Sequence, residues 1–277
     1  MIMIADSGST KTTWCLVANY DVLKQIVTPG INPFYQTTGE IQELIMTTLY
    51  TGTKDFQIDK IFFYGAGCAF PDKKKTVLDA LIYFYNDANI EVESDLLGTA
   101  RALFQHQKGI ACILGTGSNS CYYDGQQIVQ NVSPLGFILG DEGSGAVMGK
   151  QLIADCLKHQ LPDWLGDKLL DEYGLTPAQI LESVYSQPFP NRFLASFTPF
   201  LLEHIEEPAI FNLVYDSFDA FFTRNVMHYN LEDIEVGFMG SIACDFRDTL
   251  EIVASERNIN VSQILCEPME GLVRFHS

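Results

Sequence analysis

The chain has 277 residues, of which 47% are hydrophobic and 19% charged, as is typical of a globular protein with a sizeable core. Its 17 lysines and arginines against 35 aspartates and glutamates give a formal net charge of −18 at pH 7. This charge repels nucleic acids and anionic membrane surfaces, so the composition argues against both as partners and favours a small molecule.

The seven cysteines are scattered, mostly inside apolar runs, and no two form a CxxC pair. Their odd number and spacing predict reduced, mainly buried thiols, and they argue against a zinc knuckle or a disulfide framework. The N-terminal stretch lacks the basic region and long apolar run of a signal peptide, and no apolar run reaches a membrane-spanning length. We therefore expect a cytoplasmic protein.

The first part of the chain predicts three strands followed by alternating helices and strands. Met1–Ala5, Thr13–Ala18 and Val22–Thr28 are rich in β-formers and are separated by short turns, which predicts an antiparallel meander. Thr37 and Glu40 have capping-box spacing and begin a helix. The remaining elements expected here are a strand at Lys60–Tyr64, a helix from Pro71, a strand at Ile90–Ser94 and a helix at Asp95–Gln105. Their order is βββαβαβα.

Past Lys108 the same order begins again. Three strands are expected at Ile110–Leu114, Ser120–Tyr123 and Gln127–Val132, then a helix from about Glu142, a helical insertion from Leu161 to about Tyr229, a strand at Ile234–Met239, a helix from Asp245, a strand at Val261–Cys266 and a last helix at Met269–His276. The chain is thus predicted to be a duplication, with domains at 1–100 and 101–268. Two such α/β domains should face one another across a cleft.

Three glycine-marked turns follow predicted strands. In Asp6–Thr12, the residues Gly8 to Thr10 could wrap phosphates while Asp6 faces Mg²⁺, or the segment could be a plain hairpin; Lys11 is not a P-loop lysine, because the GxxxxGK[ST] pattern is absent. Gly115–Ser118 has the same two interpretations. Gly237–Ala243 would suit a flat ring held against the backbone. Together the three turns indicate a phosphate-binding site.

Several polar residues near these turns allow two interpretations. Asp95 is either a helix N-cap or a carboxylate that accepts a proton from a hydroxyl nucleophile, and the two roles are compatible. Asp141 and Glu142 are either partners of a helix dipole or ligands. Asn32 and Asn119 are either turn residues or hydrogen-bonding partners of a ligand.

Four segments resemble, in their order along the chain, the motifs of the sugar-kinase/Hsp70/actin ATPase superfamily: DSGSTKT, GTGSN, LGDEGSG and GFMGSIA. They are most similar to those of the BadF/BadG/BcrA/BcrD ATPase family and its N-acetylglucosamine kinase members, over nearly the whole chain. The resemblance implies a duplicated ribonuclease H-like (actin-like ATPase) α/β fold, with the last helix, 269–277, packed on the first domain. It also implies ATP- and Mg²⁺-dependent phosphorylation of the 6-hydroxyl of N-acetylglucosamine or a related amino sugar, in a possible homodimer.

The same resemblance assigns roles to individual residues. Asp95 would be the general base, and Asp6 and Asp141 would lie near Mg²⁺. The cofactor-binding residues would be Gly8, Ser9, Thr10, Lys11, Thr12, Gly117, Ser118, Gly240, Ser241 and Ile242. The substrate-binding residues would be Asn32, Ser118, Asn119, Gly136 and Asp141.

The chain also departs from the family pattern. Leu135 stands before Gly136, where N-acetylglucosamine kinases are expected to carry tryptophan, so the exact sugar stays open. The paired cysteines of the iron–sulfur activator ATPases and the zinc motif of repressor-type glucokinases are absent. Two alternatives remain: a nucleotide-binding regulator that transfers no phosphate, and an ATPase that drives a partner protein.

Overall fold

The computed structural model describes residues 1–8 and 10–277. The chain forms two compact units. Unit 1 comprises Met1–Gln107, Asp124–Ile128 and Glu267–Ser277, and unit 2 comprises Lys108–Tyr123 and Val129–Cys266.

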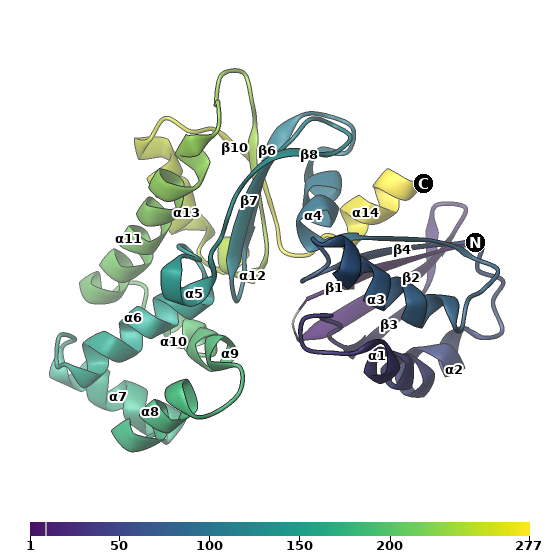
Figure 1. Ribbon diagram of the computed structural model, residues 1–277. Coiled ribbons are helices and arrows are strands. Elements are labelled where there is room, and N and C mark those ends of the chain that lie inside the picture. The colour runs from purple at the N-terminus through teal and green to yellow at the C-terminus, as the bar shows by residue number, and fades with distance from the viewer. Residues whose placement is uncertain (9) are drawn as a thin grey trace. The chain divides into compact units, whose positions relative to one another are not determined.

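Unit 1 contains a mixed sheet of five strands (Figure 1). The strands are β1 (Ile2–Ser7), β2 (Lys11–Ala18), β3 (Asp21–Pro29), β4 (Lys60–Gly65) and β5 (Asn89–Ser94). Their order is β3-β2-β1-β4-β5; β1, β2 and β3 pair antiparallel, as the meander prediction requires, and β4 and β5 continue the sheet parallel to β1.

Helices cover both faces of this sheet. They are α1 (Thr38–Ile45), the π-helical turn η1 (Met46–Tyr50), α2 (Thr51–Thr53), α3 (Pro71–Ile82), α4 (Asp95–Phe104) and α14 (Met269–His276). The predicted capping box of Thr37 and Glu40 is confirmed. Helix α14 packs on α4 so closely that a Cβ on Gly271 would lie 2.4 Å from the carbonyl oxygen of Ala102, and Figure 1 shows the two helices side by side.

Unit 2 repeats the arrangement of strands. They are β6 (Gly109–Leu114), β7 (Ser118–Tyr123), β8 (Ile128–Val132), β9 (Val236–Met239) and β10 (Val261–Leu265). The order β10-β9-β6-β7-β8 is that of unit 1 read from the other edge, with β6 antiparallel to β7 and parallel to β9. The predicted duplicated fold is confirmed.

The helices of unit 2 include the predicted insertion. They are α5 (Gly136–Leu139), α6 (Gly145–Leu157), α7 (Asp163–Tyr173), α8 (Pro177–Tyr185), α9 (Pro190–Ala195), α10 (Thr198–Glu203), α11 (Pro208–Arg224), the 3₁₀ turn η2 (Val226–His228), α12 (Ser241–Asp245) and α13 (Arg247–Glu256). Phe218, Phe221 and Phe222 of α11 are fully buried in the core of unit 2, since they recur at helical spacing.

Two sequence-based expectations are wrong. The helix expected from Glu142 begins at Gly145, because the side chain of Ser144 accepts a hydrogen bond from the backbone of Val147 and caps it. Cys244 and Cys266 form a disulfide, because α12 and the end of β10 bring Cα atoms 22 residues apart in sequence to within 5.5 Å. The other five cysteines are free and buried, as expected.

Within residues 1–8 and 10–277, no helix has both the length and the apolar character needed to cross a bilayer.

Candidate functional site

Two predicted acids lie at the carboxyl edge of the unit 1 sheet. Ser7 pairs with Gly65, and Gly65 pairs with Ser94, so β1, β4 and β5 end level with one another. Asp6 stands just before the end of β1 and Asp95 directly after β5. With Glu267 they form what we call the acidic edge. The parallel pairing explains why residues so far apart in sequence meet there.

Asp95 is not the N-cap of α4. That role belongs to Ser94, whose hydroxyl accepts a hydrogen bond from the backbone of Leu97 at 3.2 Å. Asp95 is the first residue of the helix, and its Oδ1 accepts from the backbone of Leu96 at 2.9 Å. Burial raises the pKa of Asp95, although the backbone N–H groups of Leu96 and of Asp95 itself lower it in part. Asp95 Oδ1 is thus hydrogen-bonded to the backbone of α4, and Ser94 already serves as the N-cap of this helix.

The acidic edge changes the titration of Asp6. Burial, and after it the charges of Asp95 and Glu267, raise the pKa of Asp6 from 3.8 to about 7, against the lowering effect of Lys11. Lys11 itself pairs with Glu267 at 2.8 Å, with both side chains exposed. The edge therefore carries more negative charge than its one described cationic partner neutralises.

The predicted phosphate loop after β1 is a tight hairpin. The backbone N–H of Gly8 donates to the carbonyl of Lys11 at 3.0 Å, and that of Gly30 donates to Thr10 at 3.0 Å. The side chain of Thr12 is fully buried, and its hydroxyl bonds with Ser7 at 2.7 Å, so this side chain belongs to the hairpin interior. Ser9 lies outside the described residues, and its predicted role stays a prediction.

Asn32 adopts the turn arrangement that the sequence allowed. Its Oδ1 accepts from the backbone of Phe34 at 3.0 Å, and its own N–H donates to Gln36 Oε1 at 2.8 Å. A Cβ on Gly67 would lie 2.5 Å from Asn32 Oδ1, so this side chain lies against the loop that follows β4. Its predicted contact with substrate stays a prediction.

Unit 2 has its own carboxyl edge, built from glycines. The turn Gly115–Gly117 follows β6, and Gly240 follows the neighbouring strand β9. Gly240 has φ 118°, and a Cβ there would lie 2.3 Å from the carbonyl oxygen of Leu114, so only glycine fits. Helix α6 also begins here, because Gly145 N–H donates to the carbonyl of Gly115 at 2.8 Å. We call this group of turns the glycine edge.

Asp141 lies on the glycine edge. A Cβ on Gly117 would be 3.0 Å from Asp141 Oδ2, and the carboxylate accepts a hydrogen bond from the backbone of Ser118. Burial raises the pKa of Asp141 to about 6, and the neighbouring charge of Glu142 raises it too. Asp141 has φ 54°, a left-handed conformation that is uncommon outside glycine. The structure therefore brings Gly117, Ser118 and Asp141 together.

The remaining residues predicted for this half differ in their surroundings. Asn119 Oδ1 accepts from the backbone of Ser120 at 2.9 Å and from Asn131 Nδ2 at 3.0 Å. Gly136 has φ 76° and open space where a Cβ would stand. Ser241 is exposed at the start of α12, whereas the Ile242 side chain is buried. Only backbone atoms of Ile242 could therefore meet a ligand without repacking.

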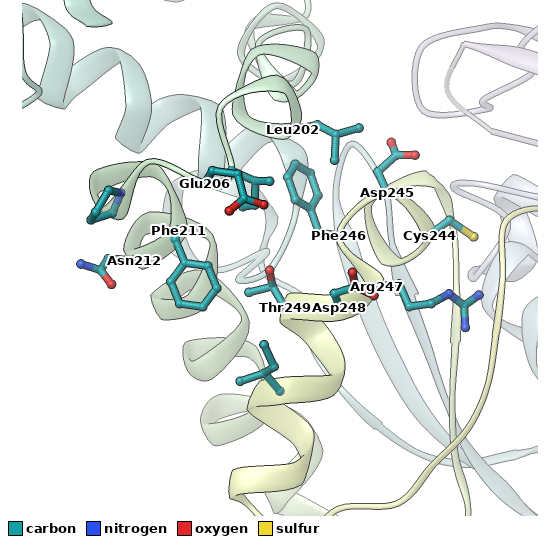
Figure 2. A pocket seen from close by; sticks show the side chains of 13 residues that line it. Leu202, Glu206, Phe211, Asn212, Cys244, Asp245, Phe246, Arg247, Asp248 and Thr249 are labelled. Atoms are coloured by element: carbon teal, nitrogen blue, oxygen red, sulfur yellow. The ribbon is translucent and has the colours of Figure 1, made fainter.

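Unit 2 contains a cavity of about 650 Å³, lined by residues of α11 on one side and by residues of α12 and α13 on another (Figure 2). Phe211 and Asn212 of α11 line one part of it, and Phe246 and Asp248 line another. The full lining also includes Leu202, Ile205, Glu206, Pro208, Cys244, Asp245, Arg247, Thr249 and Ile252. Part of its lining begins at Cys244, shortly after Gly240–Ile242 in sequence. The cavity combines apolar rings with polar groups, as small-molecule sites do. Sequence reasoning missed it, because its walls come from separate helices.

Glu267 was also missed. It pairs with Lys11 across a sequence separation of 256 residues, and no local pattern marks it.

Within residues 1–8 and 10–277, no three or more His, Cys, Asp or Glu side chains are grouped so that they could hold a metal ion by themselves. Mg²⁺ that arrives with a nucleotide needs only one or two carboxylates besides the phosphates. Asp6 of unit 1 and Asp141 of unit 2 are each, taken separately, a candidate carboxylate for that role, since burial raises the pKa of each and a cation would stabilise the charged form. Both are oxygen donors of the kind Mg²⁺ prefers.

No family model matches the chain, and no curated protein matches it. Among solved structures, a Porphyromonas gingivalis protein named "putative N-acetylglucosamine kinase" shares 49% identity, with a TM-score of 0.97, over 100% of this chain and 98% of that one. A Chromobacterium violaceum protein of the same name shares 17% identity, with a TM-score of 0.72, over 100% and 99%. A ROK family glucokinase from Streptomyces griseus, bound to glucose and AMPPNP, shares 14%, with a TM-score of 0.59, over 99% and 97%. The last two show the fold alone.

Proposed function

Since the chain belongs to the actin-like sugar-kinase family of the Porphyromonas gingivalis protein, we propose that it transfers phosphate from ATP to the 6-hydroxyl of N-acetylglucosamine or a related amino sugar. The 49% identity with that protein over the full chain supports kinase activity, and the name of that protein supports an amino sugar as the substrate. Membership of the BadF/BadG/BcrA/BcrD ATPase family is supported only by the sequence motifs.

Unit 2 would bind the nucleotide. Gly117 and Ser118 would approach the phosphates, while Gly240 and Ser241 would meet the adenosine. The cavity is large enough for a purine, and it offers Phe211 and Phe246 as apolar surfaces. The Cβ-free backbone of Gly240 supports a close approach there.

Unit 1 would supply the general base, and the placement of Asp95 is the observation that carries this proposal. Ser94 caps α4 and Asp95 Oδ1 accepts from Leu96, so the other carboxylate oxygen would accept the proton of the sugar hydroxyl as the hydroxyl oxygen bonds to the γ-phosphorus. The bond between that phosphorus and the β,γ-bridging oxygen breaks, and ADP leaves. Burial raises the pKa of Asp95, which makes it a stronger base than an exposed aspartate.

Asp6 of unit 1 and Asp141 of unit 2 would each be a candidate ligand of Mg²⁺, which neutralises phosphate charge when bound. Their own contribution is to present oxygen atoms on rigid elements: Asp6 lies within β1, and the Asp141 carboxylate is fixed by the backbone N–H of Ser118.

The test is ADP release over a panel of hexoses, hexosamines and N-acetylhexosamines. We expect turnover that depends on an amino sugar, and a loss of at least about 100-fold in kcat for Asp95→Asn, because general base catalysis contributes about 10²–10⁴-fold. Asp79→Asn is the matched control, since Asp79 forms an exposed i,i+4 pair with Lys75.

Other outcomes would support the alternatives. Nucleotide binding without turnover for any sugar would favour a regulator, and sugar-independent hydrolysis would favour an ATPase that drives a partner protein. Full activity of Asp95→Asn would eliminate the proposed role of Asp95.

A further inference from the structure

Helix α11 ends against the turn that carries Asp141. Arg224 Nε lies 2.9 Å from Glu142 Oε1, and Asn225 Nδ2 donates to Glu142 Oε2 at 3.4 Å. The Glu142 side chain is only 13% exposed, and Asn225 is buried. The Glu142 carboxylate therefore points to the end of α11, and it is not simply a partner of the dipole of α6.

The next residue of the turn also contacts α11. The backbone N–H of Gly143 donates to Ser217 Oγ at 3.2 Å, and a Cβ on Gly143 would lie 3.0 Å from Phe221 Cβ. All of these contacts come from one face at the end of α11. The residues that make them have the spacing i, i+4, i+7 and i+8: Ser217, Phe221, Arg224 and Asn225.

The turn needs this support because its backbone is unusual. Asp141 has φ 54° and Gly143 has φ 74°. The N–H of Asp141 donates to Pro134 at 2.8 Å, and that of Ser144 donates to Asp141 at 3.1 Å. A left-handed residue other than glycine persists only where its surroundings hold it. Movement of Glu142 would therefore carry Asp141 away from Ser118.

We propose that Arg224 and Asn225 are positioning residues, which fix Asp141 by holding Glu142. The inference rests on the proposed function for the role of Asp141, but its structural part stands by itself. Neither residue contacts a reacting atom in the proposed mechanism. α11 also lines the cavity with Phe211 and Asn212 at its first turns, so one rigid helix would connect the proposed nucleotide site to the turn of Asp141.

The kinetic test uses Arg224→Ala, Glu142→Gln and the double variant. Arg224→Ala should raise the KM for Mg²⁺–ATP about fivefold, because Asp141 is a proposed Mg²⁺ ligand and the variant loses one partly exposed ion pair. The double variant should be no worse than Glu142→Gln, because the two residues act through one contact. Arg224→Lys should recover part of the loss. Lys168→Ala is the control, since it removes a cation from the exposed Lys168–Glu203 pair of the same unit.

The structural test is hydrogen exchange of the ligand-free protein. Arg224→Ala should speed exchange several-fold in a peptide spanning 140–147, while peptides from β6 and the Lys168→Ala protein stay unchanged. Unchanged exchange in 140–147, or losses in all kinetic constants that follow a lower Tm, would overturn the inference. If the wild type turns over no sugar but Arg224→Ala speeds this exchange, the proposed function fails and the positioning role stands.

Discussion

The carboxyl edges of the two sheets share a topology and differ in chemistry. In unit 1 the ends of β1, β4 and β5 carry Asp6 and Asp95, while in unit 2 the corresponding ends of β6 and β9 carry glycine turns and the start of α6. The acidic edge buries Asp6 beside two other acids, and burial first and their charges second raise the pKa of Asp6. The glycine edge removes Cβ atoms where backbones approach closely.

In the proposed reaction the acidic edge would supply the base, and the glycine edge would supply the contacts to phosphate. Buried carboxylates reduce stability in the absence of a ligand, whereas a glycine turn is limited mainly by sterics. Mutations at the two edges should therefore shift stability in opposite directions.

The largest expected effect is at the glycine edge. Gly240→Ala should lower the free energy of unfolding by about 3–5 kcal/mol, because its Cβ would clash with a backbone carbonyl at 2.3 Å and its φ is 118°. Urea unfolding measures this change. Gly166→Ala in α7 is the matched control, since its Cβ would find only an ordinary contact at 3.7 Å from Cys156 Sγ, and it should be neutral or slightly stabilising. Equal effects of both substitutions would contradict the comparison.

At the acidic edge, a substitution should raise the free energy of unfolding instead of lowering it. The pKa of Asp6 is about 7 in the folded state against 3.8 ordinarily, so the unfolded state loses this proton first and stability falls as pH rises from about 4 to 7. Asp6→Asn should therefore raise the free energy of unfolding by about 2–3 kcal/mol at pH 8, with the gain vanishing near pH 4. Urea unfolding at both pH values tests this; a gain that is independent of pH would point to packing instead.

The smallest expected effect on stability is at His276, which belongs to unit 1 but not to the acidic edge. His276 of α14 stacks on Phe62 at 3.6 Å, and its Nε2 bonds with the Tyr64 hydroxyl at 2.7 Å. Burial and the charge of Arg101 lower the pKa of His276 to about 4. The unfolded state takes up this proton near pH 6.5 and the folded state only near 4, so His276 lowers stability as pH falls through that window.

His276→Gln should remove this dependence. Because the ring is partly exposed, we expect the variant to gain only about 1–2 kcal/mol on the wild type between pH 7 and 4.5. Chemical unfolding across that range provides the measurement. A constant difference between the two proteins would show that His276 keeps its ordinary titration.

The sequence by itself determined the order of elements and the turns. Strand and helix periodicities and the capping box of Thr37 are local signals, so the twice-repeated βββαβαβα pattern could be read without coordinates. Repetition of that pattern then implied two sheets of like topology, as found. The resemblance added candidate roles for residues such as Asp95, which stay proposals.

Only the tertiary structure decided which partners these residues have. Ser94 and Asp95 are adjacent, and either suits an N-cap; strand ends and packing assign that role to Ser94. Glu142 faces α11 because a helix begun 66 residues later returns to it, and Cys244 meets Cys266 because β9 and β10 are neighbours. Such long-range contacts depend on how elements pack, and no local sequence pattern encodes them.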